Sequence, residues 1–474
     1  MINPTMNVNL KRYADETTYV ETFGDNLSSI KDLEKDPLIR DLIITLSQGS
    51  GIDCELVRID LQRFLMHHLE SSPGYLEKKA SNHLLLPLFF GYMLTRLSIR
   101  KNARTGLMLD AWYSGSEDTF FGARMTSALK EKHCCSILQF TKLKGIRPID
   151  LFKSMPLYVK CIAKCGKISR THNFDLSRYV GMFYVNYLAG LKIRKECASS
   201  LIISGNDNGF PLIKAKAAGA KVMLIQNGMR PYLGSSTFAY ADHYFSMGAE
   251  KINEARKEMG CVFKNVYFFG SLRLHNFLSS EKGASDAGER RILYDIMFVD
   301  GFDLPGIDEA FEKIYSIENE KKLIGMLNDM ASTGEFRIAF QLRGDKTVDD
   351  LKNFGLFSEH INYISGREQS IYTTLLSSEV VLTGLSTVGL EAMALNKRVC
   401  YANLSGNARI AYEYRDLNIE YREGPGSLSD YIKELMKQDK DYRKYIIQNP
   451  RYVDDLLSIV DRELKEDSHA KHAE

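Results

Sequence analysis

The sequence predicts an α/β protein with two doubly wound parallel sheets behind a helical N-terminal part. Three observations carry this prediction. Short apolar runs alternate with helical patterns from residue 201 onward, a polar segment interrupts the alternation at 279–290, and the alternation then resumes. The chain of 474 residues is also too long for one ordinary core, so two or three domains are expected.

The composition is typical of a globular protein, with 44% hydrophobic and 26% charged residues. Lys and Arg number 62 and Asp and Glu 60, so the net charge of +2 gives no reason to expect a nucleic-acid partner. Eight cysteines without disulfide spacing fit a reducing compartment. The polar first twenty residues lack a secretory core, so a cytoplasmic location is expected.

The N-terminal part, residues 1–105, is expected to be helical, because apolar residues recur there at three-to-four spacing. Its most apolar segment, 84–97, is shorter than the roughly 20 residues that span a bilayer, so a core helix is favoured. An alternative is a helix lying against an anionic leaflet, since basic residues flank this segment. These basic residues are Arg96, Arg100, Lys101 and Arg104.

The first α/β domain is expected over residues 106–278. A strand at 107–109 ends at Asp110, and a polar turn with Trp112 follows it. Helical spacing over 148–194 separates this start from four further apolar runs, each ending in small or polar residues. These runs are 201–203, 222–225, 243–245 and 266–269. Alternation at this spacing predicts a parallel sheet that binds ligands at the carboxyl ends of its strands.

A second α/β domain is expected over residues 291–427, followed by C-terminal helices and a tail over 428–474. Its predicted strands are 296–299, 337–340, 361–364, 380–383 and 399–401. The segment from 380 to 401 shows the clearest strand, turn, helix, strand pattern in the chain. It makes the second domain the better candidate for a phosphate site.

The turn of this unit carries Ser386 and Thr387 at the start of its helix. Helix N-termini present unpaired N–H groups and a positive dipole end, where phosphates bind in open α/β sheets. Glu391, one helical turn later, is expected to face the same crevice. The alternative is structural: the hydroxyls only cap the helix, and Glu391 is a solvated first-turn acid.

Two successive α/β domains followed by C-terminal helices resemble the GT-B glycosyltransferase architecture, in which a nucleotide-sugar lies between two Rossmann-like domains. The motifs Ser365-Gly366-Arg367, 380–383, Ser386-Thr387 and Glu391 are similar to the donor-domain signature of bacterial enzymes that build surface carbohydrates. These enzymes are the Kdo transferases of capsule synthesis, the GT-B sialyltransferases and the CDP-glycerol glycerophosphotransferases. The resemblance implies that Ser386 and Thr387 hold donor phosphate, and Glu391 belongs to the same signature.

The segment 224–229, with Gln226 and Asn227, resembles the Gln-His-Gly turn of the glycerophosphotransferases, but Asn227 stands where the His would be. Asn cannot take a proton from an acceptor hydroxyl. Asp207, beside Asn208, is therefore the candidate base, and its loop resembles part of the acidic motif of the sialyltransferases. The alternative is that this Asn-Asp-Asn-Gly segment is only a turn.

Two arginines follow strands of the second domain. Arg343 stands where the related families carry a His-Pro, and Arg367 follows the next strand. A guanidinium could pair with a diphosphate, although lone arginines also serve as surface or interdomain salt bridges. On the acceptor side, Asp110 and Trp112 are candidate sugar contacts, and the alternative for Trp112 is a core edge.

The expected function is transfer of a sugar, for which CMP-linked donors are one candidate, to a glycan or lipid-linked acceptor. Capsule or lipopolysaccharide assembly at the cytoplasmic face of the inner membrane is the expected setting. No metal is expected, because GT-B sites can use helix dipoles and basic side chains, and no cofactor beyond the nucleotide-sugar is implied. The alternatives are a CDP-glycerol-type transferase, a sugar-nucleotide epimerase and a non-catalytic partner subunit.

Overall fold

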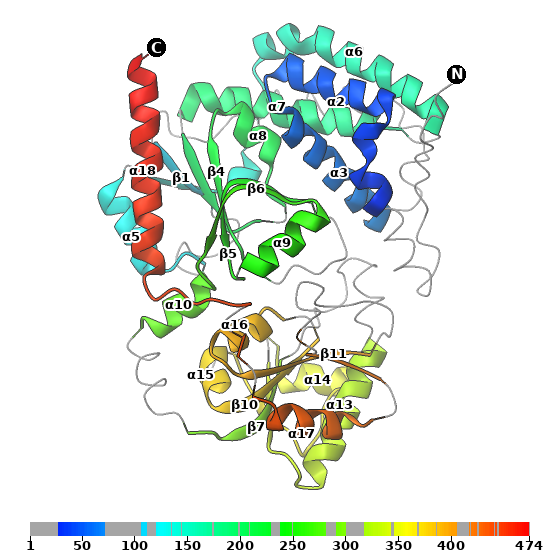
Figure 1. Cartoon of the computed structure of the whole chain (residues 1–474), viewed down its shortest axis with the longest axis vertical. Helices are drawn as coiled ribbons and strands as arrows, with labels where there is room; N and C mark the ends of the chain where they lie inside the picture. Colours follow the sequence, from blue (N-terminus) through cyan, green and yellow to red (C-terminus); the bar gives the residue numbers. More distant parts are fainter. Residues whose placement is uncertain are drawn as a thin grey trace.

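The computed structural model describes much of the chain, and its two α/β domains lie one above the other in Figure 1. The described residues are 27–71, 106–110, 120–133, 135–143, 145–172, 175–197, 200–207, 209–228, 238–248, 250–280, 291–299, 317–342, 346–366, 369–384, 386–404, 417, 419–423, 426–439, 441–442 and 445–473. Trp112, Asn208, Arg343, Arg367, the basic cluster after residue 95 and most of the predicted linker lie outside them.

The first sheet has six parallel strands in the order β2-β1-β3-β4-β5-β6. They are β1 (Leu107–Asp110), β2 (Cys135–Leu138), β3 (Leu201–Ser204), β4 (Lys221–Ile225), β5 (Tyr240–Ser246) and β6 (Val262–Phe268). The order reverses between β1 and β3, so the switch point of this doubly wound sheet lies between these two strands. The four residues of β1 and of β3 are all buried, which explains their continuous apolar runs.

Helices cover both faces of the first sheet. They are α2 (Pro37–Ser50), α3 (Cys54–Ser71), α5 (Ala123–Lys132), α6 (Pro148–His172), α7 (Ser177–Cys197), α8 (Leu212–Ala217), α9 (Glu250–Met259) and α10 (Leu272–Leu278), with the 3-10 turns η1 (Leu33–Lys35) and η3 (Phe140–Lys142). One face shares a core with α2, α3, α6, α7 and α8. The N-terminal helices are thus part of the first domain's core.

Local sequence explains why these helices begin and end where they do. The side chain of Asp36 caps α2 by accepting hydrogen bonds from the backbone N–H groups of Leu38 at 2.9 Å and Ile39 at 3.0 Å. Gly51 ends the same helix with a φ of 70°, a left-handed conformation that favours glycine. The imidazole of His172, at the end of α6, lies 2.9 Å from the Asp36 carboxylate and ties α6 to α2.

The second sheet also has six parallel strands, in the order β12-β11-β10-β7-β8-β9. They are β7 (Tyr294–Val299), β8 (Ile338–Gln341), β9 (Asn362–Ile364), β10 (Ser378–Thr383), β11 (Arg398–Asn403) and β12 (Glu420–Arg422). Counted from β7, this is the Rossmann order 6-5-4-1-2-3. Its switch point lies between β7 and β10.

Different helices cover the two faces of the second sheet. They are α13 (Ile317–Ser332), α14 (Val348–Phe354) and α17 (Leu428–Lys437) on one face, and α15 (Ile371–Leu376) and α16 (Val388–Ala394) on the other. Alternate residues of β10 divide accordingly, because Val380 and Leu382 join the first set and Val381 joins the second. The predicted class of two Rossmann-like domains is confirmed by these sheet orders.

The last helix, α18 (Tyr452–Ala473), belongs to the first domain and not to the second. Its residues Tyr452, Leu456 and Val460 are buried in one core with α5 and the first sheet, and Figure 1 shows the helix standing beside β1 and α5. The chain therefore passes between the domains twice, after α10 and again before α18.

The segment that leads back to the first domain, just before α18, lies beside the residues that follow β5 and β6. The backbone N–H of Asn449 donates to the carbonyl of Phe269 at 3.0 Å, and Gly248 pairs antiparallel with Ile446. Gly270 has a φ of 84°, and a Cβ at this position would lie 2.1 Å from the carbonyl oxygen of Ile447. This close backbone approach requires glycine.

Candidate functional site

The Ser386-Thr387 turn follows β10 at the switch point of the second sheet. The Thr383 hydroxyl donates to the carbonyl of Val299 at 3.1 Å, so the ends of β10 and β7 are joined across this point. The same hydroxyl accepts from the backbone N–H of Ser386 at 3.1 Å. The turn is therefore fixed to the two strands between which open α/β sheets bind ligands.

Both hydroxyl residues of the turn are half-buried, and they differ in what they do for α16. The Ser386 hydroxyl accepts from the Val388 backbone N–H at 3.3 Å, which is part of the capping role given above as the alternative. Thr387 has helical dihedral angles and makes no side-chain cap. Capping thus accounts for Ser386 in part and does not account for Thr387.

Glu391 lies in the contact between the two domains. Its side chain is buried, and its Oε1 accepts from the hydroxyls of Ser271 at 2.5 Å and Tyr372 at 2.9 Å. Ser271 caps α10 by accepting from the Leu274 backbone N–H at 3.2 Å. Tyr372 also packs against Phe277 of α10, with ring centroids 5.1 Å apart. The solvated-acid alternative for Glu391 is wrong, because the side chain is buried.

Burial raises the pKa of Glu391 above its ordinary value, and the hydroxyls of Ser271 and Tyr372 oppose that rise. Burial beside the Glu391 carboxylate likewise raises the pKa of the Tyr372 phenol. The helix that begins at the Ser386-Thr387 turn is therefore held, one turn later, by a buried polar contact to the first domain. A donor or ribose contact for Glu391 remains a prediction.

Gly366 follows β9 and is exposed at the same edge of the sheet. β9 is the outermost strand on the β8 side, so two strands, β7 and β8, lie between it and β10. Arg343 follows β8 and Arg367 follows Gly366 in the chain, and both lie outside the described residues. The sheet order nevertheless puts the segments after β8, β9 and β10 at one edge.

Asp110 lies at the switch point of the first sheet and is committed to internal hydrogen bonds. Its carboxylate accepts from the Ser204 hydroxyl at 2.8 Å and from the Phe140 backbone N–H at 2.7 Å. Burial raises the pKa of Asp110, while those two donors oppose the rise. The carboxylate joins β1, β3 and η3, and it is buried instead of facing an acceptor.

Asp207 is the first member of a buried network of hydrogen-bonded polar side chains at the carboxyl edge of the first sheet. Its carboxylate accepts from the Tyr244 hydroxyl at 3.0 Å and from the Asn227 backbone N–H at 3.4 Å. The guanidinium of Arg256, on α9, donates to the same Tyr244 hydroxyl. Both Tyr244 and Arg256 are buried, so they hold the Asp207 carboxylate in one orientation.

Gln226 supports the loop that follows β5. Its side-chain oxygen accepts from the Met247 backbone N–H at 2.8 Å, and its amide donates to the Gly228 carbonyl at 2.8 Å. Met247 itself is buried in one apolar cluster with residues of the second domain. The carboxyl edge of the first sheet therefore faces the second domain.

Sequence reasoning missed the partners of the two central acids. Ser271 was visible only as the residue after a predicted strand, and nothing marked Tyr372, Tyr244 or Arg256. A hydrogen-bond partner that comes from another element leaves no periodic signal in the sequence. The structure brings together Asp207 with Asn227, and Ser386 with the end of β7.

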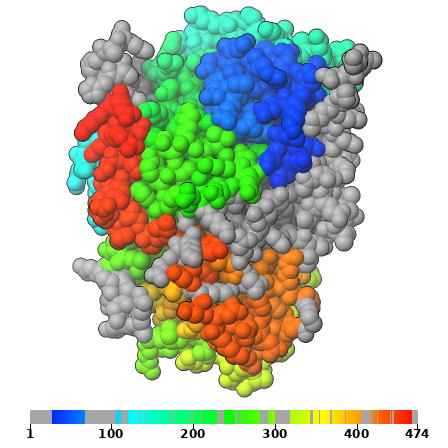
Figure 2. All heavy atoms as spheres, viewed as in Figure 1, coloured from blue at the N-terminus to red at the C-terminus, as the bar shows by residue number. Residues whose placement is uncertain are grey.

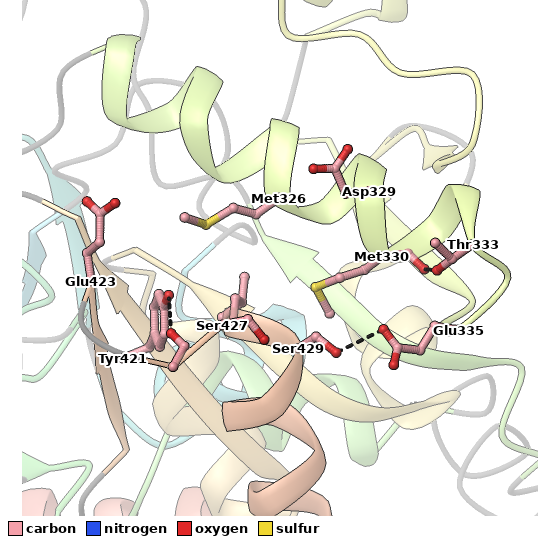
Figure 3. A pocket seen from close by; sticks show the side chains of 11 residues that line it. Met326, Asp329, Met330, Thr333, Glu335, Tyr421, Glu423, Ser427 and Ser429 are labelled. Carbon is pink, nitrogen blue, oxygen red and sulfur yellow. Dashed lines mark hydrogen bonds between the residues drawn. The ribbon is translucent and has the colours of Figure 1, made fainter.

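A pocket of about 530 Å³ opens elsewhere on the second domain, between α13, the end of β12 and the start of α17 (Figure 3). It lies on the face opposite α15 and α16, so it is not part of the switch-point turn. Asp329, Glu335 and Glu423 are among its lining residues. Glu335 and Glu423 form ion pairs with Lys433 and Lys322, so these lysines are already engaged, and Asp329 adds a further negative charge. The pocket is therefore poorly suited to the phosphates of a nucleotide-sugar.

Metal and membrane features were sought in the same described ranges. Within them, no group of three or more His, Cys, Asp or Glu side chains is arranged to hold a metal ion. None of the helices in these ranges combines the length and the hydropathy that spanning a bilayer requires.

The sequence matches no protein-family model, and no curated protein sequence is significantly similar to it. Solved structures with a similar course of the chain include UDP-GlcNAc 2-epimerase from Methanocaldococcus jannaschii, with 14% identity, a TM-score of 0.40, and coverage of 75% of this chain and 99% of that one. Another is Phytolacca americana UGT2 complexed with UDP-2-fluoro-glucose and pterostilbene, with 12% identity, a TM-score of 0.34, and coverage of 74% and 85%.

A third is the wall teichoic acid polymerase TagF, with 12% identity, a TM-score of 0.35, and coverage of 61% of this chain and 76% of that one. Similarity of this degree places the chain in no family. The description that holds is structural: the chain is a two-domain α/β protein with a Rossmann-ordered second sheet and a hydroxyl-bearing turn at its switch point.

Proposed function

We propose that the protein is a GT-B-type glycosyltransferase that moves a sugar from a nucleotide-activated donor to a glycan or lipid-linked acceptor. Bacterial surface-polysaccharide assembly is the setting that the sequence resemblance implies. One observation carries the proposal. The Ser-Thr turn of the donor signature coincides with the switch point of a sheet in Rossmann order, where dinucleotides and sugar nucleotides bind.

In this proposal the donor is held by the second domain. Ser386 and Thr387 donate hydroxyl hydrogen bonds to phosphate oxygens at the start of α16, and the developing charge of the leaving nucleotide is stabilised there. Arg343 and Arg367, from the neighbouring strand ends, supply positive charge, and Gly366 lets the backbone approach the ligand. Glu391 supports this arrangement by fixing α16 to Ser271 of the first domain.

Acceptor activation belongs to the first domain. Asp207 takes the proton of the acceptor hydroxyl as that oxygen attacks the anomeric carbon, while Tyr244 and the backbone of Asn227 orient the carboxylate. Asn208 and Trp112 are proposed to contact the acceptor. Gln226 and Asp110 act indirectly, because their side chains position the loops around the acceptor.

Nucleotide release tests this proposal. The full-length protein is incubated with CMP-, CDP-, UDP- and GDP-sugars, with and without lipid-linked acceptors. We expect acceptor-dependent release of one nucleotide, and loss of that release in the Ser386→Ala/Thr387→Val variant. An epimerised sugar formed from donor alone would instead indicate the epimerase alternative. Release of CMP from added CDP-glycerol, with transfer of glycerol phosphate to the acceptor, would indicate the polyol-phosphate alternative.

Thermal stabilisation by free nucleotides gives the donor class at little cost. A ligand that binds only the folded state at 100 times its Kd adds about 2.7 kcal/mol of apparent stability. Comparing CMP, CDP, UDP and GDP at equal concentration therefore ranks the bases. Absence of stabilisation by any of them would contradict every enzymatic form of the proposal and favour the non-catalytic alternative.

A further inference from the structure

The outer face of α6 carries a stripe of exposed apolar side chains. Ile149, Phe152, Met155 and Val159 are 48%, 72%, 37% and 59% exposed. Their spacing of three or four residues puts them on one side of the helix. Figure 1 shows α6 along the edge of the first domain farthest from the second domain, and Figure 2 shows it forming that end of the surface. Contiguous exposed apolar residues of this kind mark interaction surfaces.

The opposite face of the same helix is fixed to the protein. Cys161, Cys165 and Ile168 are fully buried in the core that α6 shares with α2 and α7. Lys164 forms an ion pair with Asp41 of α2, and the terminal His172 pairs with the α2 cap described above. Core packing thus accounts for the inner face of α6, whereas the outer stripe lies outside the core that the described residues form.

A row of lysines borders the stripe. Lys153, Lys160 and Lys167 are exposed and seven residues apart, so they follow one line along the helix next to the apolar stripe. The only acid in α6, Asp150, is buried and lies 3.5 Å from the guanidinium of Arg147. The exposed surface of α6 is therefore apolar along one line and uniformly basic along the next.

We propose that this face of α6 is a docking surface for an anionic phospholipid bilayer, with the helix lying in the plane of the interface. Phe152 and Val159 enter the acyl boundary, and the lysine row contacts lipid phosphates while its methylene stems follow the surface. A second copy of this chain fits less well, because two apposed stripes would bring two basic rows together. The inference rests on the proposed function, because a lipid-linked acceptor would lie at such a bilayer.

Vesicle flotation tests it, using the full-length protein without any donor. We expect binding to vesicles of phosphatidylcholine with roughly 30% phosphatidylglycerol, weak binding to phosphatidylcholine alone, and release by salt. Replacing all three lysines of the row by Gln should lower partitioning on the order of 100-fold. Phe152→Ser/Val159→Ser should lower it at least about tenfold, since two apolar side chains no longer leave water.

Matched controls change exposed residues of the second domain. One control is Phe357→Ser, at a residue that is 41% exposed, and the other combines Lys321→Gln, Lys352→Gln and Lys437→Gln. These variants should float as the unchanged protein does. Circular dichroism and nucleotide-induced thermal shifts verify that the α6 variants stay folded and keep their donor site, so failure of this inference differs from failure of the proposed function.

Two results would overturn the inference. One is flotation that the α6 variants leave unchanged or that ignores lipid charge. The other is a dimer, seen by sedimentation, that Phe152→Ser converts to monomer while no vesicle binding occurs at low salt. The second result would assign the stripe to self-association.

Discussion

The carboxyl edges of the two sheets are both rich in polar residues, yet they use them differently. On the first sheet, Asp110 and Asp207 are buried and accept hydrogen bonds from neighbouring strands and loops. On the second sheet, the Ser386-Thr387 turn is half-buried, and Gly366 at the same edge is exposed. The polar side chains at the first edge are therefore engaged in internal hydrogen bonds, and we call it the closed edge. The polar groups at the second edge are partly accessible to solvent, and we call it the open edge.

This difference shows that a polar residue at a strand end has two possible uses. It can form hydrogen bonds with neighbouring backbone and side-chain groups, which stabilises the loops, or it can remain available to bind a ligand. Burial and partners distinguish the two uses, whereas residue type does not. Donor binding is therefore best assigned to the second domain, and the first domain's acids contribute at least as much to stability as to chemistry.

The largest loss of stability is expected at Glu391, which connects the two domains. Glu391→Ala should lower the free energy of unfolding by about 3 kcal/mol, because the hydroxyls of Ser271 and Tyr372 lose their acceptor inside the protein. Urea unfolding measures this change. A loss below about 1 kcal/mol would show that the contact is not maintained in solution.

The isosteric variant Glu391→Gln gives a pH test of the same contact. Because burial raises the pKa of Glu391 above its ordinary 4.5, its contribution to stability is fully present below that value and is lost as pH rises through the raised pKa. Gln does not ionise. The stability of Glu391→Gln relative to the unchanged protein should therefore increase between acid and neutral pH, and a flat difference would contradict the raised pKa.

The closed edge predicts a stability cost at Asp207. Asp207→Asn keeps one acceptor oxygen where the carboxylate had two, and we expect a loss of about 2 kcal/mol in urea unfolding. The exposed Asp349→Asn is the control and should change stability by less than about 0.5 kcal/mol. Unchanged stability with lost turnover would give Asp207 a purely chemical role and break the contrast between the edges.

The open edge predicts the opposite pattern. Ser386→Ala/Thr387→Val should weaken nucleotide binding by about 1–3 kcal/mol in calorimetric titration, since bonds to phosphate are charge-assisted. Its stability should fall by only about 1 kcal/mol, through the Ser386 cap. Ser427→Ala, which removes the cap of α17, is the matched control: it should cost similar stability and leave affinity intact.

A comparable loss of stability is expected at Asp110. Asp110→Asn keeps one acceptor oxygen where the carboxylate uses one for Ser204 and the other for Phe140, so about 2 kcal/mol should be lost. Thermal unfolding at neutral pH measures it. A much larger loss would indicate that Asp110 organises the whole switch point of the first sheet.

The fold class was predictable because it depends on local patterns of apolar and polar residues. The strands 201–204, 221–225 and 378–383 are buried on both faces, and such strands appear as continuous apolar runs. The turn after 383 was likewise predictable, since a strand, a small residue, hydroxyls and a helix follow one another in sequence. Strand order and the position of the switch points needed the structure.

The site was less predictable for a physical reason. The partners of Glu391 lie 120 and 19 residues away along the chain, and those of Asp207 lie 37 and 20 residues away. A hydrogen bond across such separations leaves no pattern in either segment. The same holds for α18. Its amphipathic sequence predicts a buried face, yet nothing in it states which domain provides the other half of the core.

The return of α18 to the first domain has a consequence for synthesis of the chain. Tyr452, Leu456 and Val460 complete a core whose buried members outside α18 lie between residues 107 and 272. A ribosome must therefore finish the whole second domain before the first can close that core. The part made first is completed last, and until then the uncovered apolar face of its sheet is open to chaperones and to misassembly.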